Sequence, residues 1–151
     1  MATRSEAAVD SVLSDIEVAE TLIGAFNDRN VERAMAVVAD EAEWFMVPFG
    51  RTSHGPEGYR DHWGLWTTAC PDCQIETHEL IPSPGYVVAE FSGRGTHTGP
   101  LRTPKGDLPP SGKKVDLKIC DVIRIRDGKS YGSHVYFDML SVLRQIGIVP
   151  E

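Results

Sequence analysis

The segment "VDLKICDVIRIRDGK", residues 115–129, has the alternation of a β-strand that runs into a turn. The residues on one side of the alternation are aliphatic, namely Val115, Leu117, Ile119, Ile123 and Ile125. The other side carries Lys118, Arg124 and Arg126, so we expect the strand to be buried on one face only. Asp121 lies at the centre of the aliphatic side. The strand therefore brings one carboxylate to the buried face of a sheet.

The segments on either side of this strand give the order of the other elements. Helical spacing of apolar residues predicts a helix over residues 9–26, a short helix over 31–39 and then a strand over 43–50. Pro56 opens a third helix, which carries Tyr59, Trp63, Trp66 and Cys70 on one face. Strands are expected over residues 74–82, 86–99, 113–126 and 130–137, and a closing helix over 138–147. Helices followed by a run of antiparallel strands predict an α+β fold in which a curved sheet wraps over the helices.

The composition is typical of a single soluble globular domain over residues 1–151. Hydrophobic residues make up 41% of the chain, and no apolar run approaches the ~20 residues of a membrane span. The N-terminus has no basic start followed by an apolar stretch, so we expect no secretory signal. The net charge of −7 comes without the basic patch that nucleic-acid binding needs. We therefore expect a cytoplasmic protein whose partners include neither a membrane nor a nucleic acid.

The three cysteines cannot all pair, which suits a reducing compartment. Cys70 and Cys73 form the CxxC of "CPDC". No second CxxC or HxxxH completes a zinc site, and no strand precedes the motif as in thioredoxin. The sequence therefore predicts a Pro-Asp turn at the end of the third helix and no metal site.

Several short segments along the chain resemble a known family. In order, they are "AFNDRN", "CPDCQIETHELIPSPGYVVAEF", "GRGTHTGPL", "LPPSGKKV", "VIRIRDGKS", "YFD" and "LRQIG". Together they are similar to the SnoaL-like polyketide cyclases of the nuclear-transport-factor-two-like superfamily. The resemblance implies an α+β cone with a deep apolar cavity, usually dimeric through its sheet. It also implies acid/base chemistry on a hydrophobic small molecule without a cofactor, although ketosteroid isomerases, limonene-epoxide hydrolases and ligand-binding modules share the fold.

The resemblance points to two positions in this chain. The cyclases carry a catalytic aspartate three residues before the Asp of "YFD", and Val135 stands there. Their partner histidine lies seven residues before the glycine of the turn, and Asp121 stands there. Since valine cannot accept a proton, the standard aldol mechanism of the cyclases is not expected in unchanged form. Asp121, however, lies where relatives place a functional polar group inside the cavity.

A carboxylate on an apolar wall is destabilised in its charged form, so the pKa of Asp121 should rise toward neutral pH. Such a group can act as a general base or acid. It can also stay neutral and donate a hydrogen bond to a developing enolate. The alternative is a structural carboxylate that neighbouring hydroxyls or an arginine satisfy. We interpret Asp121 as the principal acid/base.

Two histidines are further candidates, and the position of His134 depends on the register of the last hairpin. A two-residue type I′ turn at Asp127-Gly128 pairs Asp121 with His134, which puts both on the cavity face. A three-residue loop shifts the pairing by one, so that His134 points outward and Asp121 shares its face with Tyr131, Ser133, Val135 and Phe137. The second set is more apolar, which favours the second register. His97, in "GTHTG", is either a hydrogen-bonding anchor, which we favour, or a proton carrier.

The aromatic residues predict the binding surface. Six residues should line a pocket suited to a flat polycyclic ligand: Trp44, Tyr59, Trp63, Trp66, Phe91 and Val135. We predict a cyclase or isomerase that moves a proton on a hydrophobic polyketide-like molecule, with Asp121, His134 and His97 as catalytic candidates. The alternative is a non-catalytic ligand-binding module that lost its base at Val135. Because the convex side of a curved sheet also has to be covered, we expect a homodimer.

Overall fold

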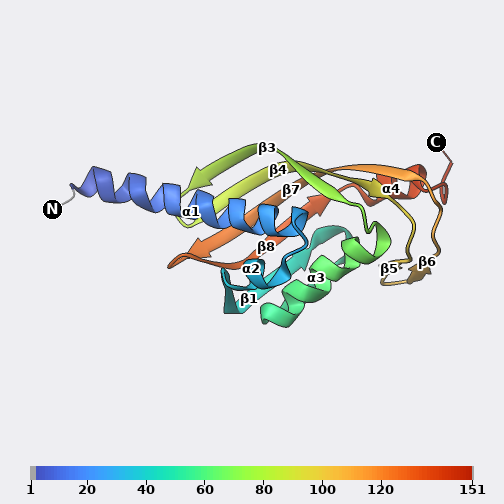
Figure 1. Ribbon diagram of the computed structural model, residues 1–151, viewed down its shortest axis with the longest axis horizontal. Helices are drawn as coiled ribbons and strands as arrows, with labels where there is room; N and C mark the ends of the chain where they lie inside the picture. The colour runs from blue at the N-terminus through green and yellow to red at the C-terminus, as the bar shows by residue number, and fades with distance from the viewer. Residues whose placement is uncertain (1–2, 151) are drawn as a thin grey trace.

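The computed structural model describes residues 3–150. Its helices are α1 (Arg4–Asn27), α2 (Val31–Met35), α3 (Gly55–Ala69) and α4 (Met139–Gln145), with a 3₁₀ turn, η1 (Val47–Phe49). Its strands are β1 (Val38–Met46), β2 (Arg51–His54), β3 (Gln74–Ser83), β4 (Tyr86–Thr96), β5 (Leu101–Thr103), β6 (Gly106–Leu108), β7 (Lys114–Arg126) and β8 (Lys129–Phe137). Figure 1 shows the long strands as one curved layer with α1, α2 and α3 together on one side of it. The first turns of α1 extend beyond the sheet (Figure 1).

The main sheet has six strands in the order β2-β1-β8-β7-β4-β3. All neighbouring pairs are antiparallel except β1 and β8, which run parallel. The predicted α+β fold with a curved, mainly antiparallel sheet is therefore confirmed. A separate pair, β5 and β6, lies between β4 and β7, where the sequence analysis predicts no strand.

The second helix is shorter than expected, because its C-terminal residues begin the sheet. α2 ends at Met35, and β1 starts at Val38. The carbonyl of Val37 accepts a hydrogen bond from Ser130 N at 2.7 Å, so this segment already pairs with β8. β-Branched valines fit a pleated surface better than a helix, and pairing with the last strand cannot be predicted from local spacing.

The α3 helix ends in the predicted Pro-Asp turn. Cys73 N donates to the carbonyl of Cys70 at 2.9 Å. The Asp72 carboxylate accepts from Thr96 N at 2.7 Å and from Thr96 Oγ1 at 2.8 Å, which ties the turn to β4. These bonds are a sufficient structural account of "CPDC".

The register of the β7–β8 hairpin combines features of both predicted alternatives. Asp127 and Gly128 have φ angles of 52° and 73°, as in a two-residue type I′ turn. The pairing shifts by one residue at a β-bulge, after which Asp121 lies opposite Val135. The register that we favoured is thus correct at Asp121, but a bulge produces it and not a three-residue loop. Tyr131, which we expected on the cavity face, lies in the bulge and stacks its ring under Arg126.

The glycine at the bulge is required by both its backbone angle and its neighbours. Gly132 has a φ of 112°, and a Cβ there would lie 1.7 Å from the carbonyl oxygen of Glu43 on β1. We expect Gly132→Ala to lower the free energy of unfolding by about 3 kcal/mol or more, as measured by urea denaturation. Gly64→Ala is the control, since a Cβ at Gly64 meets nothing within 4 Å. This change should slightly increase the stability of α3, because alanine favours a helix more than glycine does. Equal stability of Gly132→Ala and wild type would contradict a rigid bulge.

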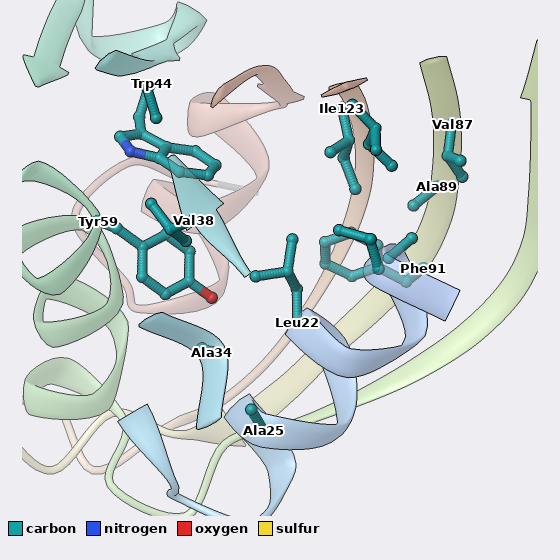
Figure 2. Packing of buried hydrophobic residues seen from close by; sticks show 14 residues of the cluster. Leu22, Ala25, Ala34, Val38, Trp44, Tyr59, Val87, Ala89, Phe91 and Ile123 are labelled. Atoms are coloured by element: carbon teal, nitrogen blue, oxygen red, sulfur yellow. The ribbon is translucent and has the colours of Figure 1, made fainter. Parts of the chain in front are cut away.

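The core lies between the helices and the concave face of the sheet. Figure 2 shows Trp44 and Tyr59 on one side, Phe91, Ala89 and Ile123 on the other, and Leu22 of α1 between them. A second cluster, around Leu101, Leu117 and Val142, fills the end where α4 packs. The aromatic face of α3 and the aliphatic face of β7 therefore line the same interior space.

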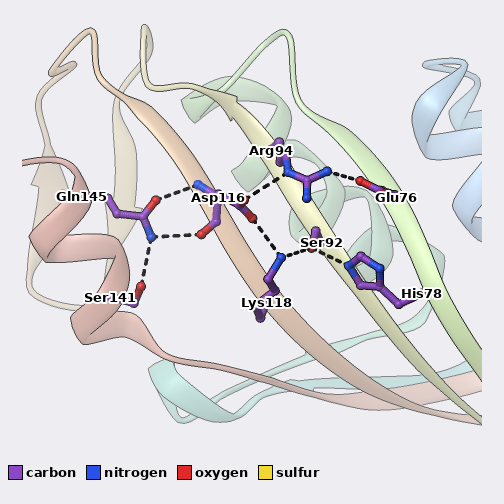
Figure 3. Close-up of polar contacts among 8 residues, drawn as sticks. All are labelled: Glu76, His78, Ser92, Arg94, Asp116, Lys118, Ser141 and Gln145. Carbon is purple, nitrogen blue, oxygen red and sulfur yellow. Dashed lines mark hydrogen bonds and ion pairs between the residues drawn. The ribbon is translucent and has the colours of Figure 1, made fainter.

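The opposite face of the sheet is polar at one end. The hydroxyl of Ser92 is bonded at 2.6 Å both to His78 Nε2 and to Lys118 Nζ (Figure 3). Arg94 pairs with Glu76 and Asp116 in the same area. The side chain of Gln145 bonds both backbone groups of Asp116, which attaches α4 to β7.

Candidate functional site

A cavity opens between α1, α3 and the concave face of the sheet. The space inside its walls amounts to about 1040 Å³, including the part that is open to solvent. Its walls include Leu22, Ile23 and Phe26 of α1, Tyr59, His62, Trp63 and Trp66 of α3, and Cys70 just after α3. The sheet contributes Trp44, Phe91, Ile119, Asp121, Ile123, Ser133, Val135 and Phe137, among others. The cavity is therefore mainly apolar, with few groups able to form hydrogen bonds.

All six residues predicted to bind a ligand line this cavity: Trp44, Tyr59, Trp63, Trp66, Phe91 and Val135. Their rings pack in tilted and edge-to-face pairs. Trp44 and Tyr59 have ring centroids 4.9 Å apart, and Trp63 lies edge-on to Phe26 at 5.6 Å. Such packing fixes the orientation of the aromatic walls.

Asp121 is the acidic group of the cavity. It projects from β7 between Ala89 of β4 and Val135 of β8, both of which are buried. Burial raises its pKa to about 7, against a smaller opposing effect of the Ser133 hydroxyl. Asp121 Oδ1 and Ser133 Oγ nevertheless have no hydrogen-bond partner among the described residues. No ion pair within residues 3–150 involves Asp121. The structure therefore does not support a structural role in which an arginine pairs with this carboxylate.

Tyr59 is a cavity residue whose pKa depends on the charge of Asp121. Burial raises the pKa of the Tyr59 hydroxyl, and the nearby Asp121 charge raises it further. The phenol therefore keeps its proton at neutral pH. Trp63 Nε1, by contrast, is a buried donor that has no hydrogen-bond partner among the described residues.

His62 is a site residue that the sequence analysis missed. It follows Tyr59 by three positions and precedes Trp66 by four, so it shares the aromatic face of α3. Burial lowers the pKa of His62 to about 4, so its imidazole is neutral at pH 7. The helical spacing alone could have identified it, but a histidine does not belong to the apolar pattern that marks this face.

The structure does not bring His134 or His97 to the cavity. His134 is exposed on the convex face, edge-on to Phe45 at 5.6 Å, because the bulge fixes the register that turns it outward. His97 is 1% exposed and does not line the cavity. Its Nδ1 accepts from Ser111 N at 3.2 Å and lies 2.9 Å from Ser111 Oγ. His97 therefore holds the segment before β7 in place, the role that we favoured.

Among the described residues there is neither a metal-binding cluster nor a helix that could span a membrane. Within residues 3–150, no group of three or more His, Cys, Asp or Glu side chains could hold a metal ion. Cys70 and Cys73 are buried free thiols. None of the described helices is both long and apolar enough to cross a bilayer.

Comparison with known proteins agrees with this architecture. The family model for SnoaL-like polyketide cyclases matches residues 16–146. No curated protein matches the sequence. A similar solved structure is a protein of Jannaschia sp. CCS1 assigned as a SnoaL-like polyketide cyclase, with a TM-score of 0.82 and 17% identity over 93% of this chain and 96% of that one.

Two further structures are similar at low sequence identity. IdmH of Streptomyces antibioticus, assigned as a polyketide cyclase, has a TM-score of 0.72 and 21% identity, covering 88% of this chain and 98% of its own. TerC, crystallised with polyporic acid, has a TM-score of 0.69 and 19% identity, covering 89% of this chain and 98% of its own. At these identities the likeness concerns the fold.

Proposed function

Since this chain belongs to the SnoaL-like polyketide cyclase family, we propose that it catalyses proton transfer on a hydrophobic polyketide-like molecule, as a cyclase or isomerase. One observation carries the proposal: the carboxyl of Asp121 is unpaired in an apolar cavity, where burial raises its pKa to about 7. A base or acid with a pKa near the working pH is the most effective proton-transfer group. Val135 stands where the family carries an aspartate, so Asp121 has to act without that partner.

The ligand is expected to be flat and largely apolar. Aromatic rings from α1, α3 and β1 form the walls, and their hydrophobic faces favour stacking. TerC, which has a similar fold, was crystallised with polyporic acid, an observation that favours a small organic ligand here too. The proposal needs neither metal nor cofactor.

A test is possible without the natural substrate. The probe is 2-tetralone, a bicyclic ketone whose C1 proton is acidic. Wild-type protein in D₂O should exchange that proton for deuterium faster than buffer does, as followed by proton NMR, and Asp121→Asn should not. If wild-type protein binds the ketone without accelerating exchange, the acid/base proposal fails and the ligand-binding module, suggested by Val135, takes its place.

We further propose that the convex face of the sheet joins two copies of the chain. One row of cross-strand neighbours is largely apolar: Ile81, Val88, Val122, His134 and Phe45. Ile81 and the nearby Tyr86 and Tyr136 are 42%, 44% and 45% exposed, so this face presents several large apolar side chains to solvent together. A second copy of the same face would bury this row.

Light scattering should therefore return twice the chain mass of 16.6 kDa. Val122→Lys places an unpaired charge at the centre of the row and should give the monomer mass. Asp107→Lys, on the small β6 strand, is the matched control and should stay dimeric. A wild-type protein that remains monomeric at high concentration would contradict this interface.

A further inference from the structure

His62 lines the cavity, but the function proposed for Asp121 gives it no role. It lies on α3, the helical wall of the cavity, whereas Asp121 lies on β7, the sheet wall. It also borders a smaller hollow with Trp44 and Arg51. A ligand held between helix and sheet would contact His62 and Asp121 on different sides.

The imidazole of His62 is available to a ligand. Its ring nitrogens have no hydrogen-bond partner among the described residues. Unlike Trp63 Nε1, they are not fully buried. Burial is the sole cause that lowers its pKa, to about 4, so one nitrogen carries a proton and the other does not at neutral pH. Neutral imidazole can donate a hydrogen bond to an oxygen that gains charge.

His62 and Asp121 reach the cavity from different walls. Tyr59 lies near Asp121, whose charge raises the pKa of the Tyr59 hydroxyl. His62 follows Tyr59 by three positions on α3 and lines the same cavity as Asp121. A ligand that fills this cavity can therefore contact both side chains.

Resting on the function proposed above, we propose that His62 donates a hydrogen bond to the carbonyl oxygen of the ligand while Asp121 removes a proton from the adjacent carbon. The C–H electron pair becomes the C=C bond of the enolate, and the carbonyl π electrons move to oxygen. The proton passes to the Asp121 carboxylate and exchanges with solvent before it returns to carbon. His62 keeps its own proton throughout, so the step is balanced with no other reactant.

The first test compares His62→Leu, which removes the donor, with His62→Gln, which keeps an N–H donor but cannot titrate. Loss of one such donor should slow the 2-tetralone exchange by roughly 10²-fold, whereas His62→Gln should stay within about tenfold of wild type. His54→Gln, at an exposed histidine just before α3, is the control and should exchange normally. A wild-type rate in His62→Leu overturns the inference, and a rate in His62→Gln as low as in His62→Leu overturns the donor role.

The second test measures binding rather than turnover. 2-Naphthol resembles the enolate of 2-tetralone, and 2-methylnaphthalene has the same rings without the oxygen. His62→Leu should weaken 2-naphthol binding by about tenfold, as followed by tryptophan quenching, and leave 2-methylnaphthalene unchanged. An equal loss for both ligands would mean that His62 only shapes the cavity, which overturns the inference.

A third measurement uses the unmodified protein. With ¹⁵N-labelled histidine, 2-naphthol should shift the ring nitrogen resonances of one histidine, identified as His62 by its loss in His62→Gln. No shift at saturation overturns the inference. The two proposals remain separable: exchange that survives Asp121→Asn defeats the acid/base function, whereas exchange lost in Asp121→Asn but intact in His62→Leu defeats only the role of His62.

Discussion

Replacing Asp121 with Asn should slow deuterium exchange into 2-tetralone by roughly 10²–10⁴-fold, the usual contribution of a general base. Asparagine has nearly the shape of aspartate and keeps the hydrogen-bonding capacity, but it cannot take up a proton. Glu90→Gln is the matched control, because Glu90 is an exposed acid on the convex face of neighbouring β4. A reduction of less than about fivefold in Asp121→Asn would assign the chemistry to another group.

The pH profile distinguishes the two roles of Asp121. A general base works in its ionised form, and burial raises the pKa of Asp121 to about 7. The exchange rate should therefore increase with pH up to about 7 and become constant above it. A neutral Asp121 that donates a hydrogen bond would instead give a rate that falls above pH 7.

The second large effect concerns stability. The pKa of Asp121 rises from 3.8 to about 7 on folding, so the folded state holds a proton that the unfolded chain has lost. Its stability contribution is present below pH 3.8 and is lost as the pH rises to about 7. At 1.36 kcal/mol for each pH unit, the loss is up to about 4 kcal/mol. Asp121→Asn should thus be more stable than wild type at pH 8, and the difference should shrink toward pH 4.

His62 has the opposite dependence. Its pKa falls from 6.5 to about 4 on folding, so its contribution is present above pH 6.5 and is lost as the pH falls to about 4. In wild type the two groups oppose each other across pH 4–6.5 and largely cancel. The free energy of unfolding can be measured with urea from pH 4 to 8. Relative to wild type, it should rise with pH in Asp121→Asn and fall with pH in His62→Gln. Parallel curves for all three proteins would mean that neither group is desolvated.

The sequence predicts the parts of this site that depend on local periodicity. Alternation along residues 115–126 places Asp121 on the buried face, and helical spacing places Tyr59, Trp63 and Trp66 on the facing helix. Both patterns survive folding because burial of these faces is what holds helix and sheet together. The composition of the odd-numbered positions of β8 also indicates that His134 faces outward.

Other features depend on contacts between distant segments. The parallel pairing of β1 with β8 converts the expected end of α2 into strand. No local pattern in the sequence predicts this pairing. The bulge at Gly132 fits against Glu43, which lies on another strand. His62 was missed for a different reason: a polar residue on an apolar helical face is visible in the sequence, but its neutral state depends on the cavity around it.

The bulge has a consequence for how this hairpin can change in evolution. Strand pairing assigns residues to the two faces by odd and even position, and one extra residue beside Gly132 reverses that assignment for the rest of β8. An insertion or deletion of one residue in the hairpin would exchange Val135 for His134 in the cavity. Changes of two residues would leave the assignment intact. The length of this hairpin is therefore free to vary only in even steps, unless a second bulge arises to compensate.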